Sequence, residues 1–482
     1  MSLFRPAFAI LGLILVILAL LMLLPLIMIL VGDAPDSRIF LISSCITAVT
    51  GLLLYFFNRG TLRHLTTRKV FLITATNWIG VATFAGIPFH LSELHLSITD
   101  AVFESVSGIT TTGSTVLHGL DTLPRDILLW RSITQWLGGI GIVAMAVMIL
   151  PFLRVGGMRL FKSESSDWSD KATPQIRVQL QYLVIVYLIL SFLCMSYYWI
   201  CGMSFFDAVN HAMTTLSTGG YSTHDSSIGF YQSKPLLWGS VLFMALSGIP
   251  FMIYVHILIN RRFSFAMDAQ VKFYFQLLGI AGVTMGLYLY FTEQMDLFTA
   301  MVHGFLNTTS IMTTTGYVSD DFGKWGPGAI AVFFFLTFVG GCSGSTSGGI
   351  KVFRFQLFWL YLREQFVRSV HPNAIITLEY NNRRVTEDVI KSSIAFMYMA
   401  MWSYAMITII LSLCGLDLVT SNTGAVTALM NVGPGLGDVV GPSGNFQTLP
   451  DIAKWVLSFG MLLGRLEYLT LYILLTPMYW RN

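Results

Sequence analysis

Long apolar stretches separated by short polar connections run through the whole chain. Ten of them are long enough to cross a bilayer, which takes about 20 helical residues. These predicted spans are residues 7–31, 39–57, 70–90, 127–153, 181–202, 236–260, 273–291, 328–362, 393–415 and 452–477. Four shorter segments, at 101–112, 206–219, 299–315 and 421–432, contain Ser, Thr, Asn or His and are too short or too polar to span. Because non-helical backbone survives at membrane depth only beside protein or water, we expect these four to re-enter the membrane along an aqueous path.

Each short segment ends in a glycine turn, and the four turns share one spacing. The turns are Thr111-Thr112-Gly113-Ser114, Thr218-Gly219-Gly220-Tyr221, Thr314-Thr315-Gly316-Tyr317 and Asn431-Val432-Gly433-Pro434. Thirteen residues before the glycine stand Asp100, Asp207, His303 and Thr420. The repeats are predicted at 70–162, 163–263, 264–372 and 373–482, behind two extra spans in 1–69. The predicted fold is an all-α integral membrane protein with four pseudo-repeats of helix, pore half-helix, filter loop and helix around one central pore.

The turns have the chemistry of a cation filter. A dehydrated cation needs oxygen ligands in place of water, and backbone carbonyls supply neutral ones. Glycine adopts the positive φ angles that such a turn requires, and a short helix ending there directs its negative dipole end at the cation. The candidate filter residues are Thr111, Thr112, Gly113, Gly219, Gly220, Thr314, Thr315, Gly316, Asn431, Val432 and Gly433.

Single features of these turns have simpler interpretations. One such turn would be an ordinary loop, but four copies at one spacing argue against that. Gly219 and Gly220 compete for the same place, and the thirteen-residue offset selects Gly220. The fourth turn lacks the threonine-rich approach of the others, which leaves its ligand geometry the least defined. Asp100 and Asp207 begin their half-helices, which favours capping and interaction with the helix dipole over a role as pore carboxylates.

Composition and charge add the protein class and an orientation. The chain has 11% charged and 55% hydrophobic residues, against about 25% charged in a soluble domain. The basic residues between repeats are Arg59, Arg63, Arg68, Lys69, Arg154, Arg159, Lys162, Lys171, Arg177, Arg261, Arg262, Lys272, Arg363, Arg368, Arg383, Arg384 and Lys391. The flanks of the short segments carry Arg125, Arg131, Lys234, Lys324 and Lys454. By the positive-inside rule, both termini are expected in the cytoplasm and all four turns on the outer side. The net charge of +3 gives no indication of nucleic-acid binding, and five scattered cysteines indicate neither disulfides nor a metal site.

A glycine- and serine-rich stretch from Gly340 to Gly349 interrupts the span at 328–362. Glycine weakens helices and serine competes for backbone groups, so we expect an intramembrane loop below the filter. A glycine-rich helix crossing is the alternative; a phosphate-binding loop is disfavoured because no strand precedes it. Arg465 lies within the last span, where a charge usually faces a cavity or partner. Glu467 is two positions away and does not share its helix face, so a mutual ion pair is not expected.

Six stretches together resemble one known family. They are 135–141 (QWLGGIG), 217–223 (STGGYST), 313–317 (TTTGY), 340–351 (GGCSGSTSGGIK), 431–435 (NVGPG) and 464–467 (GRLE). The chain resembles the Trk/Ktr/HKT superfamily of potassium transporters, most closely the TrkH-type membrane subunits of bacterial Trk systems, which the two extra N-terminal spans also match.

The resemblance implies a potassium-selective, channel-like uptake subunit of the bacterial inner membrane. It implies K+ binding at Thr112, Gly113, Gly220, Gly316 and Gly433, and glycine at all four filter positions favours potassium over sodium. It assigns a gate to Gly340, Gly341, Gly344, Ser345, Thr346, Gly348, Gly349 and Arg465. It further implies a homodimer in contact with membrane lipid, a cytosolic TrkA-like nucleotide-binding regulatory subunit, K+ as substrate and no covalent cofactor.

Two other functions remain to be separated from a channel. A secondary transporter that couples K+ to H+ or Na+ needs a coupling group at the midplane, and Glu104 and Glu467 are the nearby acidic candidates. An intramembrane enzyme needs a catalytic pair facing a cavity, and no such motif stands out. His211 and His303 fall on half-helices, where packing or capping is favoured over proton transfer.

Overall fold

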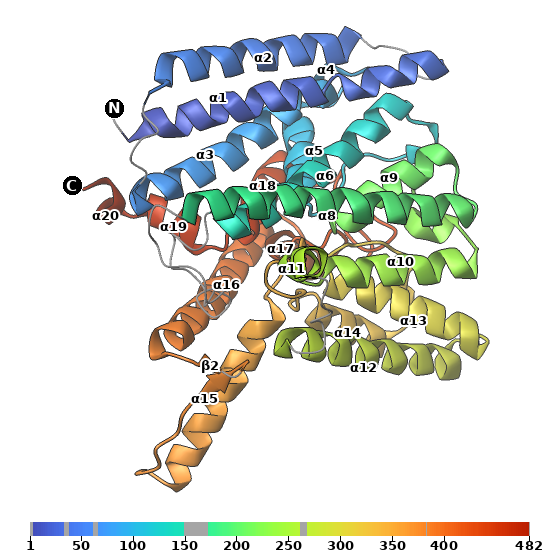
Figure 1. The fold of residues 1–482 in the computed structure, drawn as a ribbon. Coiled ribbons are helices and arrows are strands. Elements are labelled where there is room, and N and C mark those ends of the chain that lie inside the picture. The colour runs from blue at the N-terminus through green and yellow to red at the C-terminus, as the bar shows by residue number, and fades with distance from the viewer. Residues whose placement is uncertain are drawn as a thin grey trace.

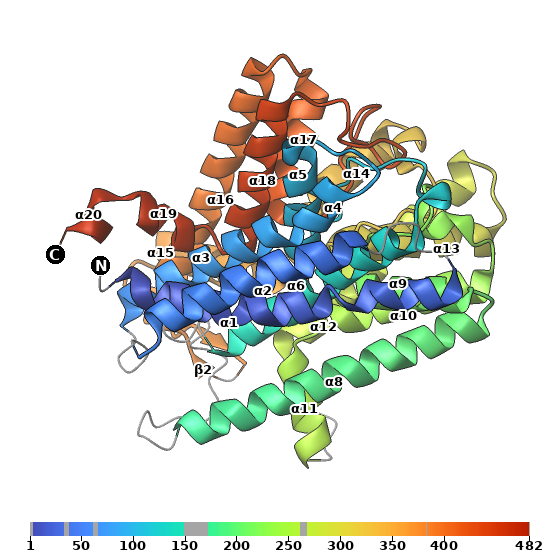
Figure 2. The same cartoon turned by 90° about the horizontal axis from the view of Figure 1, so that it is seen from above.

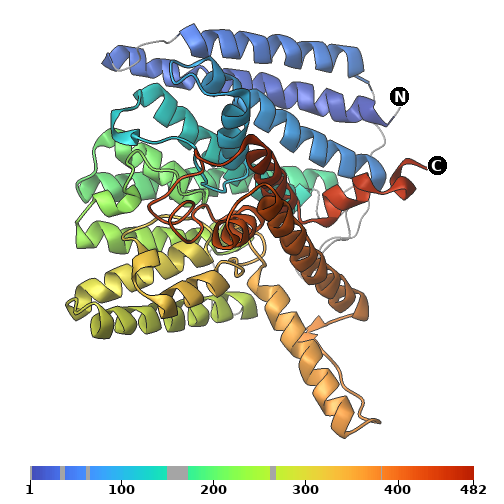
Figure 3. The same ribbon diagram turned by 180° about the vertical axis from the view of Figure 1, so that it is seen from behind.

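The computed structural model describes residues 3–32, 38–60, 66–148, 172–260, 268–381 and 383–481. The described chain is helical apart from a hairpin of two-residue strands, in which β1 (Glu379–Tyr380) pairs antiparallel with β2 (Arg383–Arg384). Many of the long helices lie along roughly the same axis, whereas α15 (Val352–Val370) and α16 (Glu387–Leu413) are inclined to it (Figure 1). Both chain ends lie on the same side of the molecule (Figures 2 and 3). The predicted all-α membrane fold is confirmed.

Two helices precede the repeats and pack beside the third helix. They are α1 (Phe4–Leu21), continued by the 3-10 segment η1 (Leu24–Val31), and α2 (Arg38–Asn58). α1 contacts both α2 and α3 (Thr67–Ala85), and the three lie side by side along one edge (Figure 1). A Cβ on Gly12 would lie 2.5 Å from Gly51 O, so α1 and α2 touch through their backbones at this pair of small residues.

Four units of helix, half-helix and helix follow. The first contains α3, α4 (Ile87–Leu91), half-helix α5 (Ile98–Ile109), η2 (Leu120–Thr122) and α6 (Arg125–Met148). The second contains α8 (Ala172–Ile200), half-helix α9 (Phe205–Leu216), η4 (Ser227–Phe230), α10 (Lys234–Ser247) and α11 (Phe251–Asn260). The third contains α12 (Ala269–Thr292), half-helix α13 (Leu297–Met312), η6 (Phe322–Lys324), α14 (Pro327–Leu336) and α15 (Val352–Val370). The fourth contains α16 (Glu387–Leu413), half-helix α17 (Leu418–Met430), α18 (Asp451–Arg465), α19 (Leu469–Leu475) and α20 (Pro477–Trp480).

The second long helix of the last three units is broken, whereas the hydropathy pattern predicted a break only in the third. Among the described residues, seven helices can cross a membrane, or nine if two bent pairs each count as one span. α10 and α11 meet at 85°, and α18 and α19 at 116°, so the predicted spans at 236–260 and 452–477 each consist of two helices that meet at a bend. Pro250 lacks the N–H that helix α10 would need to continue. Glu467 and Tyr468 have φ angles of 58° and 51°, which end α18.

The half-helices begin with side-chain caps. Each N-cap side chain accepts the backbone N–H three residues on, at 3.0–3.1 Å, and the caps are Ser97, Ser204, Asp296 and Asp417. Asp100 and Asp207 lie in the first turn and accept the hydroxyls of Ser97 and Ser204 at 2.8 and 2.7 Å. The two aspartates therefore hold the hydroxyl of the capping serine in place, and the cap itself is the serine. α13 begins one turn earlier than its counterparts, which places His303 inside the helix.

Some sequence predictions fall outside the described residues. They are the repeat boundaries at 162/163 and 263/264 and the basic residues Arg63, Arg154, Arg159, Lys162, Lys171, Arg261 and Arg262. Two basic residues assigned to the opposite flanks are buried inside the protein. Arg131 pairs with Glu104 at 2.8 Å, and Lys454 pairs with Asp100 at 2.6 Å, so neither contributes a loop charge. The five cysteines are all free.

Candidate functional site

The four half-helices end in the same hydrogen-bonded turn. The N–H directly before each turn glycine donates to the carbonyl five residues back, at 2.8–3.1 Å, in the pairs Thr112–Ser107, Gly219–Thr214, Thr315–Ser310 and Val432–Thr427. The preceding residues are left-handed, with φ of 52–57°: Thr111, Thr218, Thr314 and Asn431. Together these features make a Schellman-type C-cap in each repeat. Threonine is β-branched and unfavourable in this conformation, so three of the four turns store backbone strain.

The glycine that follows is also left-handed in every turn. The φ angles are 88° at Gly113, 76° at Gly220, 80° at Gly316 and 103° at Gly433. Gly219 is not among the residues with positive φ, so Gly220 is the structural equivalent of the other three glycines. This is the position that the thirteen-residue spacing selects.

The four turns meet in a closed ring. A Cβ on each glycine would collide with the carbonyl oxygen that precedes the glycine of the next repeat. The distances are 2.2 Å from Gly113 to Gly219 O, 1.8 Å from Gly220 to Thr315 O, 2.1 Å from Gly316 to Val432 O and 2.8 Å from Gly433 to Thr112 O. The last contact returns to the first repeat, so the turns follow one another around a common centre. Glycine is required here both by φ and by this close approach.

Side chains tie neighbouring turns together. Gln135 on α6 donates from Nε2 to Gly219 O at 2.7 Å and accepts the Tyr221 N–H at Oε1 at 3.0 Å. Asn431 donates to Thr112 Oγ1 at 2.9 Å, and Ser114 donates to Gly433 O at 3.0 Å. These two bonds join the fourth turn to the first. The residue that departs most from the threonine pattern, Asn431, thus takes part in closing the ring.

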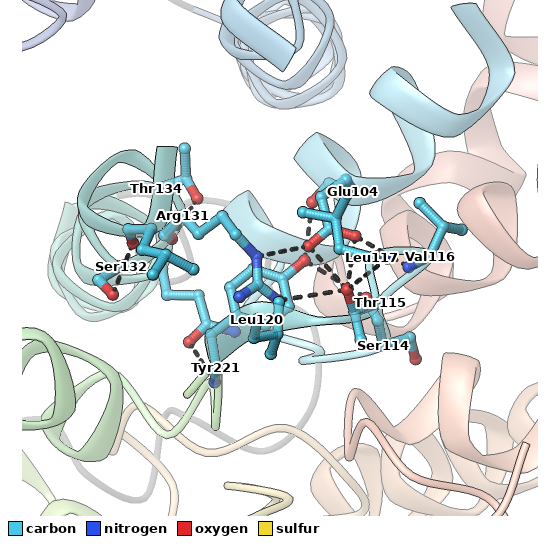
Figure 4. Close-up of polar contacts among 12 residues, drawn as sticks. Glu104, Ser114, Thr115, Val116, Leu117, Leu120, Arg131, Ser132, Thr134 and Tyr221 are labelled. Carbon is cyan, nitrogen blue, oxygen red and sulfur yellow. Dashed lines mark hydrogen bonds and ion pairs between the residues drawn. The ribbon is translucent and has the colours of Figure 1, made fainter. Parts of the chain in front are cut away.

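A buried ion pair supports the first turn (Figure 4). Glu104 on α5 is 0% exposed and Arg131 on α6 is 1% exposed, with Nε 2.8 Å from Oε1. Glu104 also accepts the Thr115 hydroxyl and the Val116 N–H, each at 3.0 Å. Arg131 reaches into the second repeat, where it donates to Ser222 O at 3.1 Å. Both carboxylate oxygens of Glu104 accept hydrogen bonds from protein donors. This arrangement suits a residue that supports the turn, which we call a brace, rather than a proton carrier.

The loop at 337–351 joins α14 to α15 and is non-helical, as predicted. It contacts the ends of three half-helices. Thr346 Oγ1 donates to Leu216 O at 3.0 Å, and the Gly348 N–H donates to Thr314 Oγ1 at 2.6 Å. A Cβ on Gly348 would lie 2.4 Å from Met430 O. The predicted gate residues therefore lie directly against the second, third and fourth turns.

Arg465 holds this loop from the end of α18. It is 3% exposed, and Nη1 donates to Thr346 O at 3.0 Å. Glu467 lies beyond the helix break and pairs with Arg354 of α15 at 2.7 Å, so Arg465 and Glu467 do not pair. A cavity of about 40 Å³ lies under the loop and is lined by both residues together with Lys351 and Arg354. Lys351 donates from Nζ to Ser347 O.

Sequence reasoning brought the turns, the loop and Arg465 together but missed several supporting residues. Gln135 lies in one of the six family stretches and had no assigned role. Arg131 was counted as a flank charge, although its place within an apolar span, 27 residues after Glu104, was a signal for pairing. Ser347, Lys351 and Arg354 also line the cavity; the first two lie in the family stretch 340–351 without an assigned role, and Arg354 lies outside it.

The chain is similar to known cation transporters over its length. Residues 36–482 match the family model TrkH, described as a cation transport protein. The Trk system potassium uptake protein TrkI of Halomonas elongata is 44% identical over 99% of this chain and 97% of the relative. TrkH of Escherichia coli is 34% identical over 99% of this chain and 100% of its own length. The crystal structure of the potassium transporter TrkH from Vibrio parahaemolyticus superimposes with a TM-score of 0.92 at 32% identity, covering 99% of this chain and 100% of that one. With this ring of turns and these relatives, the chain belongs to the TrkH family of multi-pass membrane cation transport proteins.

Proposed function

We propose that this chain is the potassium-selective, channel-like subunit of a Trk-type uptake system, with K+ passing through the ring of turns. The closed ring carries the proposal, because it brings one backbone carbonyl from each repeat to equivalent places around a centre. Four neutral oxygens per layer are the ligands that replace water around K+. The proposed K+ site comprises Thr112, Gly113, Gly220, Gly316 and Gly433, with K+ as substrate and no covalent cofactor. The names of the relatives from Halomonas elongata and Escherichia coli support potassium as the ion.

We propose that the loop at 337–351 is the gate and that Arg465 controls it. In support, the loop lies against three turns, and Arg465 bonds directly to the Thr346 carbonyl within it. A positive charge in a region of low dielectric repels a cation far more strongly than in water. Deleting residues 341–347 is expected to raise basal flux while the discrimination between K+ and Na+ stays intact.

We further propose a place and partners for this subunit. The location is the bacterial inner membrane, with both termini cytoplasmic. In support, both chain ends lie on one side (Figure 2) and the connections between repeats are rich in Lys and Arg. The assembly is a lipid-embedded homodimer that binds a cytosolic TrkA-like nucleotide-binding regulatory subunit. The term "Trk system" in the names of the relatives supports an assembly with several components.

Flux through the purified protein in liposomes tests the proposed function. Uptake is compared for K+, Rb+, Na+ and Li+, with and without an imposed proton gradient. We expect K+ and Rb+ to pass down their own gradients and Na+ and Li+ to be largely excluded. Flux that requires the proton gradient, or a Na+ gradient, would instead indicate a secondary symporter. Equal flux of all four ions would overturn the selective filter.

A further inference from the structure

One position recurs on the inner side of the half-helices without belonging to the turns. Nine residues before the turn glycine stand Glu104, His211, Asn307 and Gly424. In the first three repeats this side chain is buried and bonds to the chain that leaves the turn, two or three residues after the glycine. The chemistry differs in each repeat, whereas the place of the contact is the same.

In the second repeat the contact is made by an imidazole. His211 is 0% exposed, and its Nδ1 lies 2.9 Å from Asp207 O. A carbonyl only accepts, so Nδ1 carries the proton and Nε2 is free to accept. Nε2 then accepts the Ser222 hydroxyl at 3.0 Å, two residues after Gly220.

In the third repeat an amide makes both bonds. Asn307 accepts the Ser319 N–H at Oδ1 at 3.2 Å and donates from Nδ2 to Ser319 Oγ at 2.9 Å. Ser319 is three residues after Gly316. In the fourth repeat Gly424 has no side chain, and two threonine hydroxyls of α17 bond to the chain that leaves the turn instead. Thr423 donates to Leu436 O at 3.0 Å, and Thr427 donates to Pro434 O at 3.1 Å.

The two ends of each turn are thereby held to one helix. The Schellman-type bonds fix the chain entering the turn, and the recurring side chain fixes the chain leaving it. The turn glycine lies between the two anchors. Because glycine itself is permissive, its conformation depends on these anchors more than on its own preferences. The ring of ion-binding carbonyls keeps its geometry only if the residues bonded to the turns hold them within fractions of an ångström.

We propose that in the first three repeats the residue nine positions before the turn glycine is a positioning residue for ion discrimination. The ionic contact of the first repeat is the strongest, and the fourth repeat, with glycine at this position, lacks this contact. The inference rests on the proposed potassium function. The order follows from the contacts. Glu104 is paired with a buried arginine that also reaches the second repeat, whereas the fourth repeat has no side chain at this position and only the neutral hydroxyl bonds of Thr423 and Thr427.

The test uses a matched set of variants in the full chain. His211→Leu removes the bond to Ser222, whereas His211→Gln keeps an acceptor at nearly the same reach. Asn307→Leu removes the two bonds from Asn307 to Ser319 in the third repeat, while the contact of His303 Nδ1 with Ser319 Oγ at 2.8 Å remains. Gly424→Ala is the control, since a Cβ there meets nothing closer than 3.8 Å and no brace is lost. The readout is the ratio of Rb+ to Na+ permeability in liposomes, per folded protein.

We expect His211→Leu and Asn307→Leu to lower this ratio roughly fivefold, the factor that corresponds to one net hydrogen bond. His211→Gln and Gly424→Ala should keep the wild-type ratio. A role in packing alone predicts lost thermal stability with an unchanged ratio, and that result overturns the proposal. If His211→Leu does not fold, Ser222→Ala removes the same hydrogen bond from the loop side. An unchanged ratio of Rb+ to Na+ permeability in Ser222→Ala would also overturn the proposal. A wild-type protein that does not discriminate overturns the potassium function itself, together with the brace.

Discussion

At the scale of single residues, the four turn glycines differ in how tightly they are enclosed. All four have positive φ, but a Cβ added to the glycine would lie between 1.8 Å, at Gly220, and 2.8 Å, at Gly433, from the next carbonyl oxygen. Substitution is therefore strained everywhere and most obstructed at the second turn. The backbone strain alone is of order 1–3 kcal/mol.

We predict that alanine at the four positions has graded effects. Gly220→Ala should be the most damaging and Gly433→Ala the least, with loss of Rb+ over Na+ discrimination in each. Thermal unfolding in detergent and Rb+ uptake per folded protein check the order. Gly424→Ala, in an open part of α17, serves as the control. Equal effects at Gly220 and Gly433 would contradict the contact distances.

The pair Glu104–Arg131 should be far more important for stability than a surface pair. Glu104→Gln leaves a buried guanidinium without its carboxylate, which is expected to destabilise by about 3–5 kcal/mol. Lys391 and Glu387 form an exposed pair on α16, with side chains 72% and 84% accessible. Lys391→Ala should change stability far less than Glu104→Gln, because solvent screens an exposed pair. Unfolding titrations of both variants give the comparison, and similar losses would contradict the buried brace.

His224, in the loop after the second turn, should make stability depend on pH. Burial alone would lower the pKa of His224, but the carboxylates of Asp207 and Asp121 outweigh it, so the pKa is raised above its ordinary 6.5. His224 Nε2 lies 3.7 Å from Asp207 Oδ2, and Nδ1 pairs with Asp121. A raised pKa means that the protonated form is stabilised by folding. This contribution is complete below about pH 6.5 and is lost as the pH rises through the folded pKa.

The corresponding experiment compares wild type with His224→Gln. The wild-type advantage in unfolding temperature should be largest near about pH 5.5 and should shrink toward about pH 8.5. An advantage that stays constant over this range would show that His224 acts by packing on Phe230, whose ring centroid is 3.7 Å from that of His224.

At the scale of elements, the loop at 337–351 is bonded to several neighbouring helices, through backbone groups at Cys342, Ser343, Gly344 and Gly348 as well as through Thr346. Thr346 has the central place, because its hydroxyl donates to Leu216 O and Ser247 O and its carbonyl accepts from Arg465. One residue thus connects α9, α10 and α18 to the loop.

We predict that Thr346→Val loosens the loop and raises basal Rb+ uptake, while the Rb+ to Na+ ratio is unchanged. Valine keeps the shape and removes only the hydroxyl. Thr408→Val on α16 is the matched control, since the Thr408 hydroxyl has no hydrogen-bond partner in the described structure. Wild-type uptake by Thr346→Val would show that the loop is held without the Thr346 hydroxyl, by its other bonds to Gln270, Thr314 and Arg465.

At the scale of the whole molecule, the ring is built by one chain whose four units all point the same way. Because both ends of the chain lie on one side (Figure 3), a label at either terminus should have the same accessibility. We predict that cysteines placed at residues 3 and 481 are protected from an impermeant thiol reagent in intact cells and react in inverted vesicles. A cysteine at Ser226, beyond the second turn, should show the opposite pattern. Opposite behaviour of the two termini would exclude this topology.

The sequence by itself determined the features that depend on local chemistry. Hydropathy defined the helices, and spacing from each half-helix identified Gly220 rather than Gly219, because a helix ending and its turn involve only a few consecutive residues. The irregular loop was also visible, because glycine and serine disfavour helix wherever they occur together.

Only the tertiary structure decided the rest. The breaks in the second and fourth repeats lie within spans that are apolar on average, so mean hydropathy does not register a bend of 85° or 116°. The contact from Gly433 back to Thr112 joins residues at opposite ends of the pore-forming chain, and no local pattern encodes it. From the sequence, Arg131 is expected to be a charged residue flanking a short segment, but in the fold it is buried and paired with Glu104. Ring closure and ion pairing depend on how distant segments meet, and that is settled by the packing of the whole fold.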